Sequence, residues 1–350
     1  MTGRNRSRSV AIFIAIILAG CSGNPQKQWT APPCALPDPS RLVVPFERCG
    51  PYDVADETIV LGDATRNRKI EATVYAPARG TGPFPLILFS HGLGNSHEGY
   101  RYLGRHWASH GYIAVHLNHQ GSDLAVLNED GVLSLMMSLV DRKHWRDRAK
   151  DVSFAITELG ARRASIQVAS LGKETLAPST LLEGRIDFTR IGVAGHSFGA
   201  FTALEIIGLR VGTKAPDPRV RAAIIISAPR LKRLAEDDDF AKIATPALHL
   251  TGTRDESRLF YTFLRHRRMP FDKMGRSDQY LVILKGADHS TFSDDPPEFD
   301  PNHARHIHAI QTATTAFWDA YLKGEPGAKE WLRSGRISEW LGESASVEFK

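Results

Sequence analysis

A short stretch in the middle of the 350-residue chain constrains its fold more than any other feature. Apolar and β-branched residues, which favour a strand, run into Gly195-His196-Ser197-Phe198-Gly199, and helix-forming residues follow. This Gly-x-Ser-x-Gly spacing is typical of a sharp strand-to-helix turn in which the glycines let neighbouring backbone pass close by. Such a turn exposes the serine hydroxyl beside the N–H groups of the helix N-terminus. We therefore interpret Ser197 as a nucleophile.

Strands and helices alternate along most of the chain on both sides of this turn. Two strands of alternating polarity, 58–61 and 69–75, predict an antiparallel hairpin. The continuously apolar segment 86–90 is typical of a strand buried on both faces of a parallel sheet. We expect an α/β fold with a mostly parallel, doubly wound sheet, the hairpin at its edge and helices on both faces.

Two residues placed after later strands are candidates to activate the serine. A serine hydroxyl needs a general base, and the base needs an orienting carboxylate. Predicted strands at 247–251 and 280–284 each end shortly before a suitable side chain. We interpret Asp255 as the orienting acid and His289 as the base. Asp288 is an alternative acid, but adjacent side chains point apart, which makes it a poor partner for its neighbour.

Two backbone N–H groups are candidates for an oxyanion hole, which ester or amide cleavage by a serine requires. The first belongs to Phe198, directly after the nucleophile at the helix N-terminus. The second comes from the loop His91-Gly92-Leu93-Gly94, where the glycines let the backbone approach closely. The N–H of Leu93 is the candidate in that loop.

The chain resembles α/β-hydrolases of the group that includes the platelet-activating-factor acetylhydrolases and the predicted dienelactone hydrolases. The resemblance covers about residues 55–325 and rests on four motifs, which are Phe89 to Gly94, Arg185-Ile186-Asp187, Gly195 to Gly199, and Gly286-Ala287-Asp288-His289. It implies an α/β-hydrolase fold, a serine hydrolase without a cofactor, and oxyanion donors at Leu93 and Phe198.

Two departures from that group qualify the resemblance. The acetylhydrolases carry the acid after the sixth strand, where this chain has Ser227-Ala228-Pro229 without a carboxylate. The acid role therefore moves to Asp255, the more general α/β-hydrolase position. Dienelactone hydrolases use a cysteine nucleophile, whereas this chain has Ser197, which argues against dienelactone as the substrate.

The N-terminus has the layout of a bacterial secretory signal. Three arginines precede an apolar run, 10–18, that is too short to span a membrane comfortably. Leu18-Ala19-Gly20-Cys21 resembles the lipobox, so we expect residues 1–20 to be removed and Cys21 to carry a lipid. An uncleaved anchor is the alternative. Either would place the body outside the cytoplasm, in the cell envelope, with proline-rich residues 21–54 as a tether.

The remaining cysteines and the charge agree with this placement. Cys34 and Cys49 would most simply form one disulfide in an oxidising compartment. Removing residues 1–20 takes away three arginines and no acidic residue, which lowers the formal net charge from +5 to +2. The high isoelectric point therefore does not indicate a nucleic-acid partner.

The predicted domain covers residues 55–325 and contains two insertions. The first, 121–140, is apolar and follows a central strand at the edge where ligand crevices form in such sheets. It is either a cover over a substrate pocket or a helix packed as ordinary core. The second, 162–184, is polar and is interpreted as a surface excursion. Residues 326–350 form a C-terminal extension.

Other patterns indicate no further chemistry. No dinucleotide or phosphate-binding motif occurs, so we expect no cofactor. The run 265–268 is basic but lacks interleaved aromatic residues, which argues against nucleic acid. We interpret Asp237-Asp238-Asp239 as a solvated loop and His196 and His249 as structural. A histidine-dense helix start lacks a His-Glu-x-x-His pattern, so no metal site is expected at His303, His306 and His308.

Together these features predict a serine hydrolase that cleaves carboxylic esters, either lipid-like or with small acyl groups, through an acyl-enzyme. The expected partners are a small-molecule ester and a membrane reached through the lipid anchor. The alternatives are a serine peptidase on the same fold and a catalytically silent envelope lipoprotein used for binding.

Overall fold

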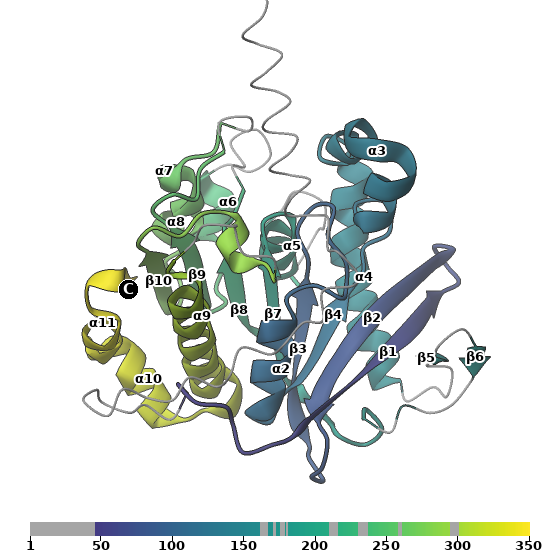
Figure 1. Ribbon diagram of the computed structural model, residues 1–350, viewed down its shortest axis with the longest axis horizontal. Coiled ribbons are helices and arrows are strands. Elements are labelled where there is room, and N and C mark those ends of the chain that lie inside the picture. The colour runs from purple at the N-terminus through teal and green to yellow at the C-terminus, as the bar shows by residue number, and fades with distance from the viewer. Residues whose placement is uncertain are drawn as a thin grey trace, which may run out of the picture.

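A single twisted sheet organises the computed structural model (Figure 1). The structure describes residues 46–161, 167–170, 173–175, 179, 181–209, 216–229, 237–257, 261–294 and 301–350. Its strands are β1 (Val54–Asp63), β2 (Arg68–Pro77), β3 (Phe84–Ser90), β4 (Ile113–Leu117), β5 (Gln167–Ser170), β6 (Lys173–Thr175), β7 (Ile186–His196), β8 (Val220–Ile226), β9 (Ala247–Gly252), β10 (Gln279–Leu284) and β11 (Ala345–Phe349). Its α-helices are α2 (Arg101–Ser109), α3 (Leu124–Ser138), α4 (Arg142–Gly160), α5 (Phe198–Ile206), α6 (Asp237–Ala241), α7 (Leu264–Arg267), α8 (Met269–Lys273), α9 (His303–Trp318), α10 (Pro326–Arg333) and α11 (Arg336–Leu341).

The strand order confirms the expected mostly parallel sheet. The order is β11-β10-β9-β8-β7-β3-β4-β2-β1-β5-β6. The pairs from β4 through β3, β7, β8 and β9 to β10 are parallel, whereas the β1–β2 hairpin is antiparallel and joins β4 through β2. The short strands β5 and β6 extend the sheet beyond the hairpin, and β11 adds an antiparallel strand to β10 at the opposite edge.

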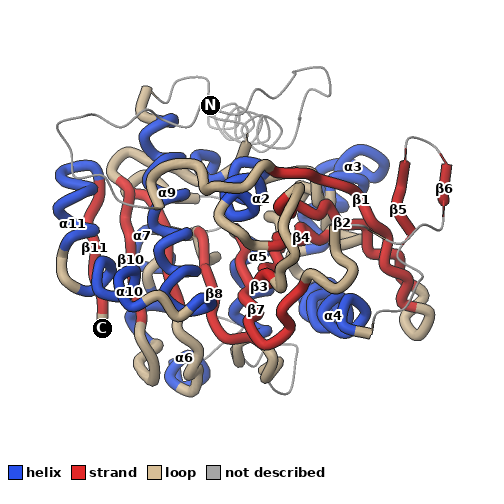
Figure 2. Tube along the Cα trace, turned by 90° about the horizontal axis from the view of Figure 1, so that it is seen from below, coloured by secondary structure: helices blue, strands red, loops and turns tan. Residues whose placement is uncertain are grey.

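Helices cover both faces of the sheet, as expected for a doubly wound fold (Figure 2). Strand β3 shows how its sequence produces this layering, because alternate side chains of a strand point to opposite faces. Leu86 and Leu88 lie in the core that includes α4 and α5, whereas Ile87 and Phe89 lie in the core that includes α2 and α9. A strand that is buried on both faces needs the unbroken apolar sequence observed here.

Several elements differ in extent from the sequence-based expectation. The sequence also predicts a helical segment near 256–265, whereas the structure has the two short helices α7 and α8, later in the chain. The amphipathic pattern of residues 303–322 predicts one last helix. In the structure its α-helical part, α9, ends at Trp318 and continues as the π-helical turn η2 (Asp319–Lys323).

The insertion 121–140 contains helix α3, which lies above the sheet at the same end as α7 (Figure 1). Its backbone is kinked at Gly131, whose φ is 81°. Leu127 and Leu135 are buried, whereas Leu133 is 77% exposed and Met137 is 57% exposed. The insertion is therefore a helix, but one that is only partly packed as core, and its role as a cover over a substrate pocket stays a prediction.

The C-terminal segment 326–350 packs into the domain. Trp331, Leu332 and Trp340 are buried and belong to the same core as α2 and α9. Residues 1–45 lie outside the described part, so the lipid on Cys21 and the disulfide between Cys34 and Cys49 stay predictions. None of the helices in the described ranges combines the length and apolar character that crossing a bilayer requires.

Candidate active site

Ser197 occupies the turn between β7 and α5, with φ 55° and ψ −114°. A positive φ is strained for a residue with a side chain, and such strain is found at functional sites. The flanking glycines make the turn feasible. A Cβ at Gly195 would lie 2.2 Å from the Gly199 carbonyl oxygen, and one at Gly199 would lie 1.8 Å from the Ser90 carbonyl oxygen. Both glycines of the motif are therefore required by close backbone packing.

His289 lies within hydrogen-bond distance of Ser197. It follows β10, just before the short 3-10 turn η1 (Ser290–Phe292), and its side chain is 41% exposed. Its Nε2 is 3.0 Å from Ser197 Oγ. Because β7 and β10 are in the same parallel sheet, their carboxyl ends face the same side and bring the two residues together.

Asp255 contacts the other nitrogen of the same imidazole. It follows β9 and is completely buried, and its Oδ1 is 3.0 Å from His289 Nδ1. The structure therefore joins Ser197, His289 and Asp255 in one hydrogen-bond chain. Asp288, the alternative acid, instead accepts hydrogen bonds from Ser290 and Thr291 in the turn that follows it.

Asp255 lies in a polar pocket that the sequence reasoning missed. Its Oδ2 accepts hydrogen bonds from Ser227 Oγ at 2.5 Å and from Thr251 Oγ1 at 2.9 Å. The Arg267 guanidinium lies 3.0 Å from Oδ1. Burial on its own would raise the pKa of Asp255, but the charges of Arg267 and His289 and the hydrogen bonds from His289 and Ser227 outweigh it. They hold the pKa well below its usual range, so the carboxylate stays ionised.

Arg267 is the most unexpected member of this pocket. It belongs to the basic run 265–268, yet it is only 4% exposed. It also donates hydrogen bonds to the carbonyl oxygens of Ser227 and Ala228, at 2.9 and 3.0 Å. Thus the segment after β8, which lacks a carboxylate, still contributes to the site. Ser227 Oγ lies 2.8 Å from His289 Nδ1, and Ser227 itself has a positive φ of 56°.

The loop with Leu93 lies beside the serine. A Cβ built on Gly92 would be 3.6 Å from Ser197 Cβ and 3.2 Å from the Tyr100 hydroxyl oxygen. Phe198 begins α5, so its backbone N–H belongs to the N-terminus of that helix. The two candidate oxyanion donors thus come from two different segments that both adjoin Ser197.

The histidines interpreted as structural are buried with polar partners. His196 Nδ1 lies 2.8 Å from the Tyr100 hydroxyl, and the His196 ring lies 4.6 Å from the His289 ring, centroid to centroid. Burial holds the pKa of His196 well below its usual value, so the ring is neutral at neutral pH. His249 Nε2 lies 3.0 Å from Gln279 Oε1.

Metal ligation has no cluster of side chains to support it in the described part of the chain. Two of the three histidines near the start of α9 have separate partners. His306 bonds the Lys285 carbonyl oxygen, and His308 bonds the Glu47 carbonyl oxygen.

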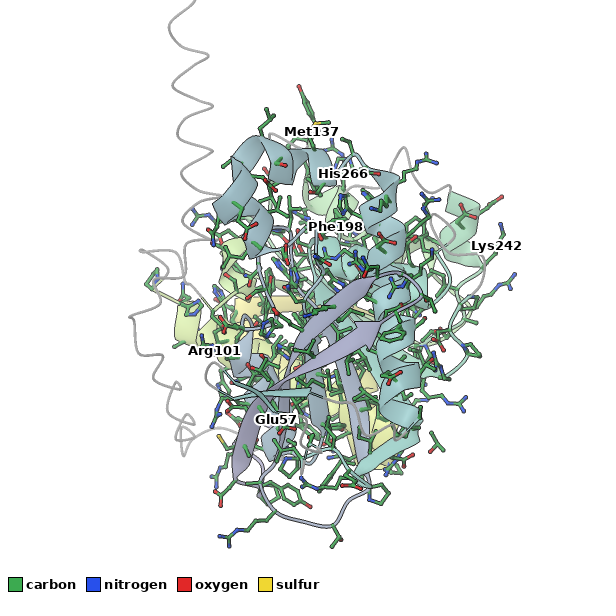
Figure 3. The ribbon with its side chains drawn as sticks, turned by 90° about the vertical axis from the view of Figure 1, so that its right-hand side faces the viewer. Glu57, Arg101, Met137, Phe198, Lys242 and His266 are labelled. Carbon is green, nitrogen blue, oxygen red and sulfur yellow. The ribbon has the colours of Figure 1, made fainter. Side chains whose placement is uncertain are left out.

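A cavity of about 500 Å³ is lined by α3 and by residues around the start of α4. Its lining combines apolar and polar side chains from α3 and the start of α4. These residues are Gly121, Val126, Asp130, Ser134, Met137, Ser138, Val140, Asp141 and His144. Figure 3 shows Met137 and His266 farther out than Phe198, at the same end of the molecule.

Comparison with known proteins places this geometry in a family. Residues 87–323 match the model of the alpha/beta hydrolase family, which is well over half of the chain. The chain belongs to the alpha/beta hydrolase family. The matched segment extends from β3 to the end of η2 and so includes every residue of the hydrogen-bond chain described above.

Three relatives are platelet-activating factor acetylhydrolases. The chain is 25% identical to the protein from Cavia porcellus over 244 residues, which are 65% of this chain and 52% of that protein. It is also 25% identical to those from Bos taurus and Canis lupus familiaris, over 60% and 63% of this chain and 48% and 50% of those proteins. The chain thus spans about half the length of the curated relatives it matches.

Proposed function

We propose that the chain is a serine hydrolase that cleaves carboxylic esters through an acyl-enzyme intermediate. The hydrogen-bond chain from Ser197 through His289 to Asp255 carries this proposal. In that arrangement, a neutral His289 accepts the hydroxyl proton at Nε2 while its Nδ1–H donates to Asp255. The ionised, buried carboxylate selects this tautomer and stabilises the imidazolium that forms.

The reaction has two halves. In each half, His289 first accepts one proton and then donates it. Ser197 Oγ attacks the ester carbonyl carbon as its proton passes to His289 Nε2. The imidazolium then gives this proton to the leaving alcohol oxygen as the C–O bond breaks, which leaves an acyl group on Ser197. In the second half, water gives a proton to His289 and attacks the acyl carbon. His289 returns the proton to Ser197 as the acid leaves.

The backbone N–H groups of Leu93 and Phe198 are the proposed oxyanion donors. The close approach of Gly92 to Ser197 and the position of Phe198 at the start of α5 support this assignment. Preorganised donors stabilise the negative charge that develops on the former carbonyl oxygen. Removing one such donor from an enzyme costs on the order of 10²–10³ in kcat.

The substrate class we propose is a lipid-like ester or an ester with a small acyl group. The names of the three relatives, which specify an acetylhydrolase, support the small acyl group. The apolar residues of α3 above the sheet support a substrate with an apolar portion. The substrate class is argued independently of the hydrogen-bond chain. It can therefore be wrong even if the proposed catalytic mechanism is right.

The decisive experiment is labelling and turnover with the purified chain in detergent. Wild type should react with a fluorophosphonate probe and hydrolyse a series of p-nitrophenyl esters, and Ser197→Ala should do neither. Ser153→Ala is the matched control, because Ser153, on α4, bonds Asp217 and lies outside the proposed machinery. Hydrolysis of peptide p-nitroanilides instead of esters would favour a peptidase. Absence of both labelling and turnover in the folded protein would favour a silent binding protein.

A paired substitution separates the two candidate acids. Asp255→Asn should lower kcat on the order of 10⁴-fold, because the amide favours the wrong tautomer of His289. Asp288→Asn should have little effect, since Asn retains an oxygen that can accept hydrogen bonds from Ser290 and Thr291. The reverse pattern would assign the orienting role to Asp288.

We also place the chain in the bacterial envelope, anchored by a lipid on Cys21 and facing the periplasm or the exterior. The support is the lipobox-like sequence that ends at Cys21. Cys21→Ala should move the protein from the detergent-rich to the aqueous phase in a detergent phase-separation assay. An unchanged distribution would exclude this anchor.

A further inference from the structure

Two buried side chains hold the loop that carries Leu93. They are His91, which has no exposed surface, and Arg148, which is 1% exposed. Neither takes part in the proton transfers described above. Both nevertheless bond the backbone on which an oxyanion donor depends.

The partners of His91 determine which of its nitrogens carries the proton. Its Nε2 lies 3.1 Å from the backbone N–H of His119, which can only donate, so Nε2 accepts. Burial, and then the positive charge of Arg148, hold the pKa of His91 well below its usual value, so the ring is neutral. The single ring proton therefore lies on Nδ1, which donates to the Gly92 carbonyl oxygen at 2.6 Å.

This hydrogen bond fixes the direction of the Leu93 N–H. The Gly92 carbonyl and the Leu93 N–H belong to the same trans peptide group, which is planar, so they point in opposite directions. A donor that holds the carbonyl oxygen therefore prevents the peptide from rotating. Since Gly92 also packs against Ser197, a rotated peptide would take the Leu93 N–H away from the oxyanion.

Arg148 connects the same loop to the second donor. Its Nη2 donates to the His91 carbonyl oxygen at 2.5 Å. Its guanidinium carbon lies 4.3 Å from the centroid of the Phe198 ring, close enough for a cation–π interaction. One side chain from α4 thus contacts the backbone of the loop that carries Leu93 and the side chain of Phe198.

A second hydrogen-bond chain supports the segment that sets the His91 tautomer. His119 Nε2 lies 3.0 Å from Ser90 Oγ, and His119 Nδ1 lies 3.2 Å from Asp151 Oδ2. Arg68 also bonds Asp151, from strand β2. These residues resemble a catalytic triad in order, but Ser90, His119 and Asp151 are buried away from solvent. Their effect is to hold the His119 backbone in place beside His91.

We propose that His91 and Arg148 are positioning residues that orient the Leu93 and Phe198 N–H groups toward the oxyanion. This inference rests on the proposed function, because it assumes that these two groups stabilise a tetrahedral intermediate. It adds that the oxyanion hole is preorganised by a neutral histidine and a buried cation rather than by the loop sequence alone.

The test compares two substitutions of His91 that differ in hydrogen bonding. His91→Phe keeps a buried ring but removes the donor to Gly92, whereas His91→Asn retains an N–H close to the position of Nδ1. We expect His91→Phe to lower kcat on the order of 10–100-fold, less than the 10²–10³ for deleting a donor outright. KM for p-nitrophenyl acetate should stay nearly unchanged, and His91→Asn should recover most of the loss.

Binding of a transition-state analogue distinguishes positioning from general damage. An alkyl trifluoromethyl ketone forms an adduct with Ser197 whose oxygen occupies the oxyanion position. Its inhibition constant should rise in His91→Phe by the same factor as kcat falls. The matched control is His249→Phe, another buried histidine with one side-chain partner, which should leave both constants unchanged.

The outcomes separate this inference from the proposed function. Unchanged kcat and inhibitor affinity in a folded His91→Phe, with Ser197→Ala inactive, would overturn the positioning role alone. Activity in Ser197→Ala would overturn the proposed function itself. If His91→Phe does not fold, Arg148→Lys decides, because it keeps the charge but shortens the reach to the His91 carbonyl. A parallel loss of kcat and inhibitor affinity there would support the inference, and unchanged values would overturn it.

Discussion

Replacing Arg267 by glutamine should raise the pH at which activity is lost on the acid side. Asp255 is wholly buried, and burial disfavours its charged form. The Arg267 guanidinium, 3.0 Å from Asp255 Oδ1, counteracts this effect. Two unit charges about 4 Å apart attract by about 4 kcal/mol at an effective dielectric constant of about 20, which corresponds to about 3 pKa units. Loss of the cation therefore raises the pKa of Asp255 by up to that amount.

A protonated Asp255 no longer holds the imidazolium of His289, so turnover falls with protonation. The acid limb of kcat/KM for p-nitrophenyl butyrate should move upward in Arg267→Gln, because Arg267 Nη2 also lies 3.2 Å from His289 Nδ1 and loss of this cation favours the protonated, inactive base. Arg267→Lys is the matched control, since it keeps the charge while losing part of the hydrogen bonding, and its acid limb should stay close to that of wild type. The assay follows the absorbance of p-nitrophenol at its isosbestic wavelength, because its absorption coefficient there does not depend on pH.

The stability of the same variants provides an independent check. The pKa of Asp255 is lower in the folded chain than in the unfolded chain, where it is about 3.9. Its contribution to stability is therefore present above about pH 4 and is lost as the pH falls through the folded-state pKa. Arg267→Gln should thus be most destabilised, relative to wild type, at neutral pH. A folded Arg267→Gln with an unchanged acid limb would refute the role assigned to the cation.

Three further predictions concern other parts of the structure. Ser227→Ala removes the 2.5 Å hydrogen bond to Asp255 and should lower kcat about tenfold with KM unchanged, which steady-state kinetics would measure. In Gly192→Ala the added Cβ would lie 2.7 Å from the Trp318 ring, so the free energy of unfolding measured in urea should fall by about 1–3 kcal/mol. Gly275 faces open space, so the free energy of unfolding of the control Gly275→Ala should stay within about 0.5 kcal/mol of wild type. Burial lowers the pKa of His116 to about 3, and the pKa values of His119 and His249 to about 4, so the free energy of unfolding should fall as the pH drops below about 6.5. Equal stability at pH 7.5 and pH 5 would contradict this last expectation.

Local sequence patterns predicted the fold and identified three residues that the structure brings together at the candidate site. Ser197 could be recognised from the sequence because its turn needs glycines at fixed spacing. The close backbone contacts of Gly195 and Gly199 leave no room for a Cβ and explain this requirement. Asp255 and His289 were readable because each follows a strand of a parallel sheet, whose carboxyl ends lie on one side. In these cases, sequence neighbours determine the position of the residue.

The residues that sequence reasoning missed depend on contacts between distant segments. Arg267 lies in a run of basic residues, a pattern typical of an exposed surface, and only its packing beneath the carbonyls of Ser227 and Ala228 buries it. Arg148 contacts His91 across 57 residues of sequence. We interpret residues 326–350 as an extension from the sequence, whereas the structure packs them into the domain. The two tryptophans Trp331 and Trp340 are the apolar residues that could have indicated this packing.

The two sides of the proposed site have fixed charge for different physical reasons. On the acid side, Asp255 stays ionised because Arg267 and several hydrogen-bond donors outweigh its burial. On the oxyanion side, His91 and His196 stay neutral because burial dominates and no carboxylate among the described residues hydrogen-bonds either ring. A histidine that is neutral when folded contributes stability above pH 6.5 and loses it as the pH falls, which is the same direction as for Asp255 but at a higher pH. Acid should therefore begin to lower the free energy of unfolding through these histidines at a higher pH than through the carboxylate that orients His289.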